Sequence, residues 1–459
     1  MTPMEVSGPV HARVLALVER YGWNATAFQT LEPGYSYLFD GDDACVAYVD
    51  TGRAWVAAGA PIAPPERIAA VTHAFVAAAR AAGRRAALVA TEERLVAAVG
   101  PSLRALRIGE QPVWDPRAWP ARVAASRTVR EQLRRARRKG VTVRQATAAE
   151  LEAGPTREAI AQLIERWLAT REMAPLGFLV HLDPFSFATH RRCFVAEVAG
   201  RVVGFAGVVP VPARGGWFIE DLLRDARAPN GTSEFLVDAV MQWAGAHGSE
   251  WLTLGVAPLA GEVPPLLRVA RRARVLYDFD GLRRYKAKLQ PDSWTPVYLS
   301  VPARQPRLLS FLDVMAAFSG GGLLRFALRS ILRGPRVLVG ALAALLVPWT
   351  ILVMLAPPER WFGAPWVKWG WVLFDAAVAA ALFRFLRRPT LALVTGLAVA
   401  ATGDALLTAL QTFLWNAPRA RGLTDALVLA TACLAPTLAA VLLWGTRAHR
   451  AAILARNSE

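Results

Sequence analysis

Four long apolar stretches near the C-terminus constrain the fold of this chain more than any other feature of its sequence. They cover residues 335–356, 366–386, 390–414 and 424–445. Each is about long enough to cross a hydrocarbon core, for which an α-helix needs roughly 20 apolar residues. The sequence therefore predicts an all-α domain of four transmembrane helices, and this domain accounts for the high hydrophobic fraction of 54%.

Basic residues flank these stretches unevenly. The more basic flanks hold Arg325, Arg329, Arg333 and Arg336, then Arg384, Arg387 and Arg388, and finally Arg447, Arg450 and Arg456. The two opposite loops hold only Arg360 and Lys368, and Arg419 and Arg421. Because cytoplasmic loops carry the excess of Lys and Arg, we expect a multi-pass protein of the cell membrane. Both termini and the large region before the helices are then cytoplasmic.

The net charge and the cysteines limit the kinds of partner and cofactor that the protein can have. The formal net charge of +17 implies an anionic partner, either RNA or the acidic inner leaflet. Cys45, Cys193 and Cys433 are widely scattered, so the sequence offers neither a disulfide framework nor a zinc-binding spacing. We expect no metal and no cofactor.

The first 300 residues alternate short strands with amphipathic helices, which is typical of the α/β class. A first round comprises strands at 45–50 and 54–59, a helix at 65–82 and a strand at 85–91. A second comprises a helix at 157–171, strands at 194–198, 201–209 and 217–223, a helix at 232–246 and a strand at 251–255. We expect two similar units in series, residues 1–150 and 151–303, then a basic amphipathic linker, 304–334, and the four helices within 335–450.

The strand at 217–223 is apolar except for Glu220 and Asp221. Carboxylates in such a strand cost free energy unless they are paired or functional. Arg224 follows directly and is the obvious partner, so the sequence predicts a polar pocket at the edge of a core. The alternative is an ordinary structural ion pair.

A turn after this strand opens the next helix. Asn230 and Gly231 are turn residues, and Thr232 is a good N-cap for the helix at 232–246. Such a helix start offers free backbone N–H groups to an anion, so we predict that these three residues bind substrate.

A strongly basic helix is predicted between the two units, at residues 126–139. Its cations are Arg127, Arg130, Arg134, Arg135, Arg137, Arg138 and Lys139. Val129, Leu133 and Ala136 are left to dock it, and Glu131 is its one acid. A solvated charged face is the alternative, but the lack of acidic counterparts favours binding of a polyanion through its phosphates.

The segment 308–333 bridges to the membrane helices. Apolar residues alternate with arginines around the flexible residues 319–322. This pattern suits an interfacial helix lying on anionic lipid. A linker helix packed on the preceding domain fits it equally well.

Eight segments resemble, in the same order, the C-terminal catalytic domain of lysyl- and alanyl-phosphatidylglycerol synthases. They lie at residues 21–29, 54–57, 133–140, 175–178, 220–224, 228–232, 253–255 and 281–288. Together they span roughly residues 20–300, which is far more specific than a lone motif.

This resemblance implies two acetyltransferase-like units packed together, which move an amino acid from aminoacyl-tRNA to the glycerol hydroxyl of phosphatidylglycerol in the inner leaflet. It implies that Asp221 and Arg224 are the pocket acid and arginine, with Glu220 as an alternative acid. Lys286 or Lys288 matches the family's downstream lysine, and the basic helix matches the stretch expected to meet tRNA or the lipid headgroup. Family members commonly carry their membrane helices before this domain, whereas here four follow it, so we expect them to act as an anchor.

Two other functions compete with this one. Residues 201–206 fit the loose pattern of a CoA pyrophosphate loop, which would indicate a CoA-dependent N-acyltransferase, but they fall in an apparent strand rather than at a helix start. A non-catalytic membrane protein that binds RNA or anionic lipid, or a small transporter using Asp375 and Asp404, is the third reading. That reading leaves the polar cluster around Asp221 unexplained.

Overall fold

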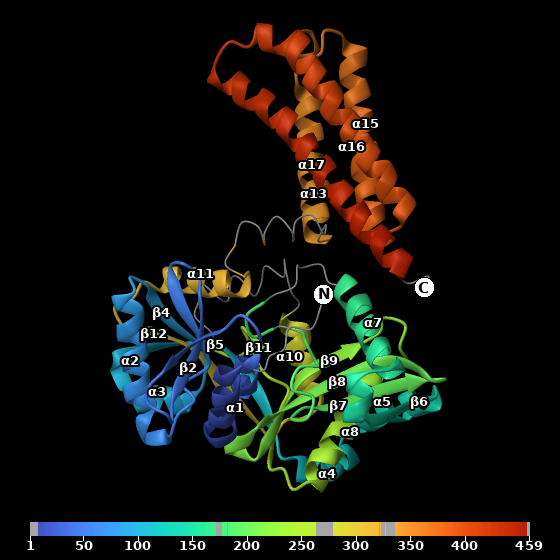
Figure 1. The fold of residues 1–459 in the computed structure, drawn as a ribbon. Helices are drawn as coiled ribbons and strands as arrows, with labels where there is room; N and C mark the ends of the chain where they lie inside the picture. The colour runs from blue at the N-terminus through green and yellow to red at the C-terminus, as the bar shows by residue number, and fades with distance from the viewer. Residues whose placement is uncertain are drawn as a thin grey trace. The chain divides into compact units, whose positions relative to one another are not determined.

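The computed structural model describes residues 8–170, 177–180, 182–262, 279–320, 322, 326 and 336–456. The chain divides into two compact units, Met1–Trp167 with Leu176–Leu323, and Leu168–Pro175 with Leu324–Glu459. Figure 1 shows the two units as ribbons, coloured from blue at the N-terminus to red at the C-terminus. Each unit is described by itself below.

Within the described residues, the first unit is built on one sheet of twelve strands. Along the sheet these are β1 (Ser36–Phe39), β2 (Cys45–Asp50), β3 (Ala54–Ala58), β4 (Arg85–Thr91), β12 (Ser293–Pro302), β5 (Leu103–Trp114), β10 (Trp251–Thr253), β9 (Gly216–Arg224), β8 (Arg201–Val211), β7 (Arg192–Val198) and β6 (Val141–Ala146). The short β11 (Ala257–Pro258) pairs with β5. The mixed sheet with helices confirms the predicted α/β class.

The same supersecondary unit occurs in each half of the sheet. In the first half, helix α2 (Ile68–Ala81) connects β3 to β4, which pair in parallel. In the second half, α8 (Thr232–Ala246) connects β9 to β10 in the same way. Antiparallel strands precede each parallel pair, β2 with β3 and β7 with β8 with β9. This repetition is the tandem arrangement that the sequence predicts.

The two halves exchange strands at the centre of the sheet. Strand β12, late in the chain, inserts between β4 and β5, and β5 in turn pairs with β10. Strand β6, which precedes the predicted boundary at residue 150, pairs with β7 beyond it. The exchange joins both halves into one sheet, and the boundaries themselves stay a prediction.

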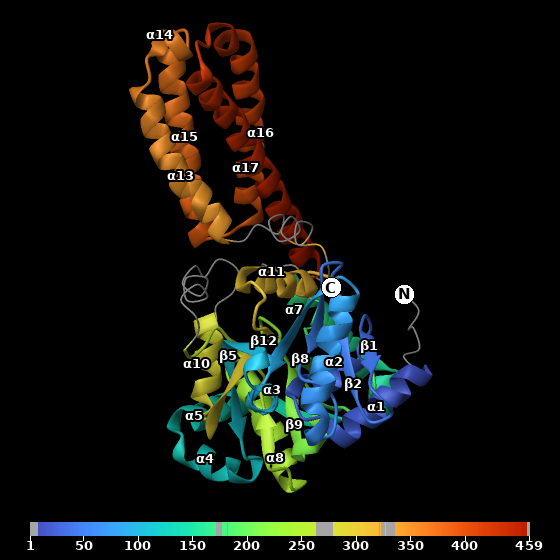
Figure 2. The same cartoon turned by 90° about the vertical axis from the view of Figure 1, so that its left-hand side faces the viewer.

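Helices cover both faces of the sheet (Figures 1 and 2). On the second half, α8 packs on one face, where Val208, Ile219 and Leu236 share a core. The first helix α1 (Pro9–Tyr21) and the 3-10 helix η1 (Ala25–Leu31) share a core with Val209 and Phe218 on the other face. The remaining helices are α3 (Glu93–Val99), α4 (Trp119–Ala125), α5 (Arg127–Arg138), α6 (Ala148–Glu152), α7 (Pro155–Ala169), α10 (Phe279–Lys288) and α11 (Arg307–Phe318).

The start of the predicted linker, α11, is a helix that packs against the first unit. Its residues Val314 and Ala317 share a core with Val56 and Leu299, and the carboxylate of Asp313 pairs with Arg85 at 2.7 Å. For this part, the packed linker helix is therefore the correct alternative. Residues 321, 323–325 and 327–334 of the linker lie outside the described part.

The second unit contains four long helices that lie side by side in Figure 2. They are α13 (Arg336–Leu355), α15 (Pro365–Arg387), α16 (Leu391–Gln411) and α17 (Leu423–Arg456), with the short α14 (Pro358–Trp361) after the first. Stretches of 18 to 29 residues in them are long and apolar enough to cross a membrane. This confirms four long apolar helices where the sequence predicts them, and their place in a membrane stays a prediction. Asp404 accepts a hydrogen bond from Thr408 of the same helix at 2.9 Å, in line with a structural role for this acid.

Candidate functional site

The acidic stretch of β9 contains a β-bulge. In the pairing with β8, Gly207 lies opposite Asp221 and Val208 lies opposite Ile219, so Glu220 is the extra residue. A bulge re-aims side chains that would otherwise alternate strictly between the two faces of a sheet. It lets the consecutive residues Glu220 and Asp221 reach the same buried cluster.

Asp221 and Arg224 lie on opposite faces of the sheet. A Cβ added at Gly207, opposite Asp221, would lie 3.0 Å from its Oδ2, whereas one at Gly204, opposite Arg224, would meet Thr232 and Leu236 at the start of α8. Residues three apart in a strand point to opposite sides. The expectation that Arg224 pairs with the two acids is therefore wrong.

The actual partner of the acids is Arg191, just before β7. Its guanidinium pairs with Glu220 and lies 3.7 Å from the carboxylate of Glu32, which follows η1. Arg191 and Glu32 are each 2% exposed and Asp221 is 7% exposed. One buried cation thus faces three buried carboxylates, and we call these four residues the acid cluster.

Burial governs the protonation of this cluster. Burial, followed by the neighbouring charge of Glu220, raises the pKa of Glu32 to about 9. The same two causes raise the pKa of Asp221 well above its usual range, although Arg191 opposes them. Since a carboxyl with a raised pKa keeps its proton near neutrality, the cluster can both donate and accept protons.

Several oxygens of the cluster lack donors. Among the described residues, no N–H or hydroxyl reaches either oxygen of Glu32 or Oε1 of Glu220. Buried acceptors without donors are uncommon in folded proteins, and they suit a cationic ligand that brings several N–H groups.

A second polar group lies on the other face, at the start of α8. Arg224 donates to the side-chain oxygen of Asn230 at 3.4 Å, and Lys288 pairs with Glu234 at 2.6 Å. The phenol oxygen of the partly buried Tyr285 is shielded from solvent, and burial raises the pKa of this phenol. The structure thus brings Arg224, Asn230 and Lys288 together, apart from the acid cluster.

Gly231, rather than Thr232, caps α8. Its φ of +96° is left-handed, and the hydroxyl of Thr232 instead donates to the carbonyl of Pro229 at 2.7 Å. A Cβ at Gly231 would lie 2.2 Å from the carbonyl oxygen of Gln132 in α5. The predicted N-cap is therefore wrong by one residue, because this close approach and the left-handed backbone both require glycine.

Lys286 has a role different from that of Lys288. Its buried Nζ donates to the carbonyls of Leu254, Gly255 and Val256, each at 2.8 Å, and burial lowers its pKa to about 7. All three of its donors are thereby used. Lys286 holds the turn after β10, so of the two predicted lysines Lys288 is the one beside Arg224.

Both polar groups contain residues of β9 that lie beyond the end of its pairing with β10. These strands pair only between residues 216–218 and 251–253, and Glu220, Asp221 and Arg224 lie beyond that point on β9. The chain after β10 turns away, and Lys286 fixes that turn. The carboxylates and the arginine therefore line the same length of an unpaired strand edge, from opposite faces.

The basic helix forms as predicted, as α5. Ser126 caps it, and Val129, Leu133 and Ala136 are its buried residues. Three of its arginines have local partners: Arg127 pairs with Glu131 at 2.7 Å, Arg130 binds a backbone carbonyl and Arg137 lies 3.5 Å from Asp238. The others, Arg134, Arg135, Arg138 and Lys139, are exposed and have no ion pair within the described part of the chain. Through Gln132, this helix contacts the start of α8 and so adjoins the second polar group.

Sequence reasoning missed Glu32 and Arg191. Neither lies near β9 in the chain, although Glu32 comes shortly after residues 21–29, one of the segments that carry the family resemblance. An arginine just before a buried strand was the one available signal for Arg191. Among the described residues no group of His, Cys, Asp and Glu side chains could hold a metal ion.

Comparisons with known proteins identify the family of the first unit. The family model described as phosphatidylglycerol lysyltransferase, C-terminal, matches residues 15–301. A phosphatidylglycerol lysyltransferase of Bacillus subtilis is 27% identical over 33% of this chain and 18% of its own length. The lysylphosphatidylglycerol biosynthesis bifunctional protein LysX of Nocardia farcinica is 27% identical over 64% of this chain and 28% of its own. This chain therefore spans less than a third of these relatives.

Two solved structures share the fold. The C-terminal domain of a protein described as a lysylphosphatidylglycerol synthetase of Agrobacterium fabrum aligns with a TM-score of 0.59 and 26% identity, covering 68% of this chain and 97% of that one. L-PGS from Bacillus licheniformis aligns over the same shares with a TM-score of 0.57 and 20% identity. Because the family model covers more than half of its residues, this chain belongs to the phosphatidylglycerol lysyltransferase C-terminal family.

Proposed function

We propose that this protein is a membrane-anchored aminoacyltransferase that moves an amino acid, lysine or alanine, from aminoacyl-tRNA to phosphatidylglycerol. The observation that carries the proposal is the acid cluster, in which three buried carboxylates face one guanidinium in a chain of this family. With three carboxyl groups around one guanidinium, the cluster can take up a further cation when Glu32 or Asp221 releases its proton. The ammonium of an aminoacyl group supplies one.

The reaction needs positioning more than activation. The aminoacyl ester is already reactive, so the enzyme must hold the lipid hydroxyl against the ester carbonyl and stabilise the oxyanion. The hydroxyl oxygen forms the new ester bond, the bond to the ribose oxygen breaks, and the hydroxyl proton passes to that ribose oxygen. No outside oxidant or nucleophile takes part.

The cluster residues have distinct proposed roles. Asp221, whose raised pKa gives it affinity for a proton near neutrality, accepts the hydroxyl proton. Glu220 and Glu32 hold the substrate ammonium, and Arg191 pairs with Glu220. On the other face, Arg224 and Lys288 hold phosphate or the oxyanion.

The basic helix α5 is the proposed contact for the tRNA. Its four exposed cations adjoin the start of α8, so a phosphate backbone lying on them runs towards Asn230, Gly231 and Thr232. The lack of aromatic side chains interleaved with these cations fits phosphate contact rather than base contact. The lipid acceptor comes from the inner leaflet, which places this unit and both termini in the cytoplasm.

Lipid extraction from cells expressing the full chain tests the proposal. Mass spectrometry should find an aminoacylated phosphatidylglycerol with the natural sequence and lose it with Asp221→Asn or Arg224→Gln. Glu250→Gln removes an exposed carboxylate outside both polar groups and should leave the product unchanged. Absence of an aminoacyl lipid from the unchanged chain, or its persistence in both variants, would refute the mechanism.

The structure weakens the CoA alternative. Residues 201–206 lie inside the extended strand β8, whereas a pyrophosphate loop would form the turn that opens a helix. Binding of RNA or anionic lipid without any transfer is a distinguishable outcome of the extraction experiment. It would appear as lipid or RNA association with no aminoacyl product.

A further inference from the structure

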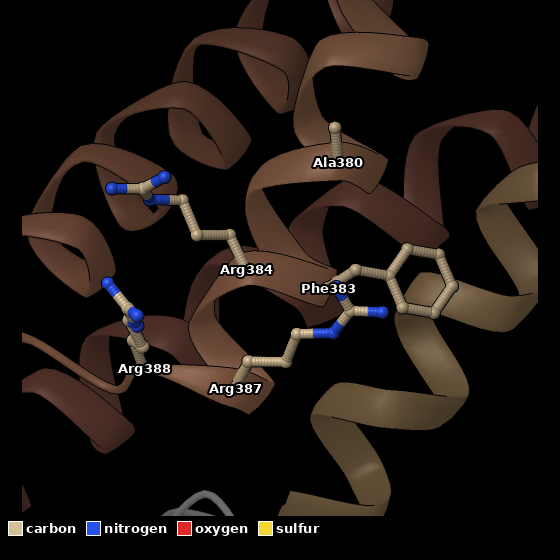
Figure 3. A pocket seen from close by; sticks show the side chains of 5 residues that line it. All are labelled: Ala380, Phe383, Arg384, Arg387 and Arg388. Carbon is tan, nitrogen blue, oxygen red and sulfur yellow. The ribbon is translucent and has the colours of Figure 1, made fainter.

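The end of α15 carries a pocket lined largely by arginine. Figure 3 shows its residues, Ala380, Phe383, Arg384, Arg387 and Arg388. Their spacing of three and four places them in one stripe along the helix. The buried residues of α15, among them Asp375, Ala379 and Leu382, form the opposite stripe. The pocket is therefore on the outer side of the four-helix unit.

Within residues 336–456, no carboxylate pairs with these arginines. The carboxylates of residues 336–456 are Glu359, Asp375, Asp404 and Asp425. Asp425 pairs with Arg360 at 2.7 Å where loops join the other ends of the helices, and Asp375 and Asp404 lie within helices. Among the described residues, Arg384, Arg387 and Arg388 have no ion pair.

The charge at this site is strongly positive. A helix C-terminus carries about half a negative charge, which alone would repel an anion. Three guanidiniums outweigh it several-fold. Arg450 of α17 lies at the same end, since it donates to the carbonyl of Pro389 at 3.3 Å.

The site lies where a lipid headgroup would be found. The 23 residues of α15 suffice to cross a hydrocarbon core, and Trp366 and Trp369 lie exposed near its other end, as interfacial anchors do. The arginines then lie at the opposite interface. Figure 3 shows Arg387 extending towards the ring of Phe383, which is 44% exposed. A polar group beside an apolar wall suits an amphiphile.

We propose that this pocket binds the phosphodiester of an anionic phospholipid, with the acyl chains along the apolar surface of α15. Guanidinium forks match phosphate oxygens in a bidentate manner. The four-helix unit then holds a specific lipid in addition to anchoring the protein. This site lies outside the residues that match the family and does not depend on aminoacyl transfer.

Native mass spectrometry of the detergent-solubilised full chain tests the proposal. Titration with phosphatidylglycerol should give more bound lipid than titration with phosphatidylcholine. The triple variant Arg384→Gln, Arg387→Gln, Arg388→Gln should weaken phosphatidylglycerol binding about tenfold or more. The triple variant in which the same three arginines become Lys keeps the charge and should keep most of the phosphatidylglycerol binding. This variant separates the effect of lost charge from that of misfolding.

A matched control removes the same charge from the opposite loops. The triple variant Lys368→Gln, Arg419→Gln, Arg421→Gln should bind phosphatidylglycerol normally. Equal binding of the two lipids, or an equal loss in both Gln triples, would overturn the proposal. So would displacement of the lipid by an equimolar amount of glycerol 3-phosphate, which would indicate a site for free phosphate. Product formation is measured separately, so failure of this site and failure of the transferase are distinguishable.

Discussion

Arg191 and Glu220 form a buried ion pair that lies next to two further carboxylates. Arg191 precedes β7, and Glu220 is the bulged residue of β9. The guanidinium is the one cation within the acid cluster. It offsets the mutual repulsion of Glu32, Glu220 and Asp221.

Replacing Arg191 by Met should therefore destabilise the fold by about 3–5 kcal/mol, since it leaves buried carboxylates without a cation. Thermal unfolding of the full chain in detergent measures the change. Arg192→Met is the matched control, because Arg192 is only half-buried and donates to backbone carbonyls. Equal effects of the two substitutions would contradict a special role for Arg191.

Glu32 should make stability depend on pH. Its folded pKa of about 9 exceeds the usual 4.5, so between these values the folded state holds a proton that the unfolded state releases. Stability contributed by this group is therefore full below pH 4.5 and falls as pH rises towards 9. Glu32→Gln should unfold at a higher temperature than the natural chain at pH 8 and at a similar one at pH 4.5. A constant difference across this range would show that the carboxyl does not titrate in this way.

The four exposed cations of α5 should govern binding of RNA. Changing Arg134, Arg135, Arg138 and Lys139 to Gln should weaken tRNA binding and reduce its salt dependence, since fewer phosphate counterions are released. Fluorescence anisotropy with labelled tRNA at several salt concentrations measures both. Arg127→Gln is the control, because Arg127 already pairs with Glu131. An unchanged salt slope in the fourfold variant would place the tRNA elsewhere.

The elements that the sequence predicts well are those marked by local signals. Helix α8 has the predicted bounds because a turn at Asn230 and Gly231 opens it and an apolar face runs through it. Strands β5 and β12 escaped prediction. Their place at the centre of the sheet depends on each other and on β4 and β10, far away in sequence, and no local pattern encodes that exchange.

The site was predictable only in part. Asp221 and Glu220 were predicted as pocket residues because carboxylates in an apolar strand are unusual, and both side chains are buried in the structure. The period-2 alternation of a strand already places Asp221 and Arg224 on opposite faces. The bulge that redirects Glu220, and the cation that Arg191 brings from β7, arise from tertiary pairing that a single strand cannot reveal.

Lys286 and Lys288 should respond differently to substitution. Lys286→Met leaves three buried carbonyls without their donor and should cost about 2–4 kcal/mol of stability. Lys288→Met removes a partly exposed ion pair and should cost about 1 kcal/mol or less, while reducing the aminoacyl-lipid product. Thermal unfolding and lipid mass spectrometry on the same preparations separate the two. A product loss confined to Lys286→Met would reverse these roles.

Gly231 should be intolerant of any side chain, because it joins α8 to the basic helix. Its φ of +96° strains an L-residue, and a Cβ there would lie 2.2 Å from the carbonyl oxygen of Gln132. Gly231→Ala should therefore cost the strain, about 1 kcal/mol, and a further 1–3 kcal/mol or so of overpacking. Gly215 has a φ of +54° and open space around it, so Gly215→Ala should lose only the stability that corresponds to the backbone strain. Because the clash displaces α5 from the start of α8, Gly231→Ala should also weaken tRNA binding, whereas Gly215→Ala should not. Equal unfolding temperatures for the two variants would mean that α5 can move away from α8 without cost.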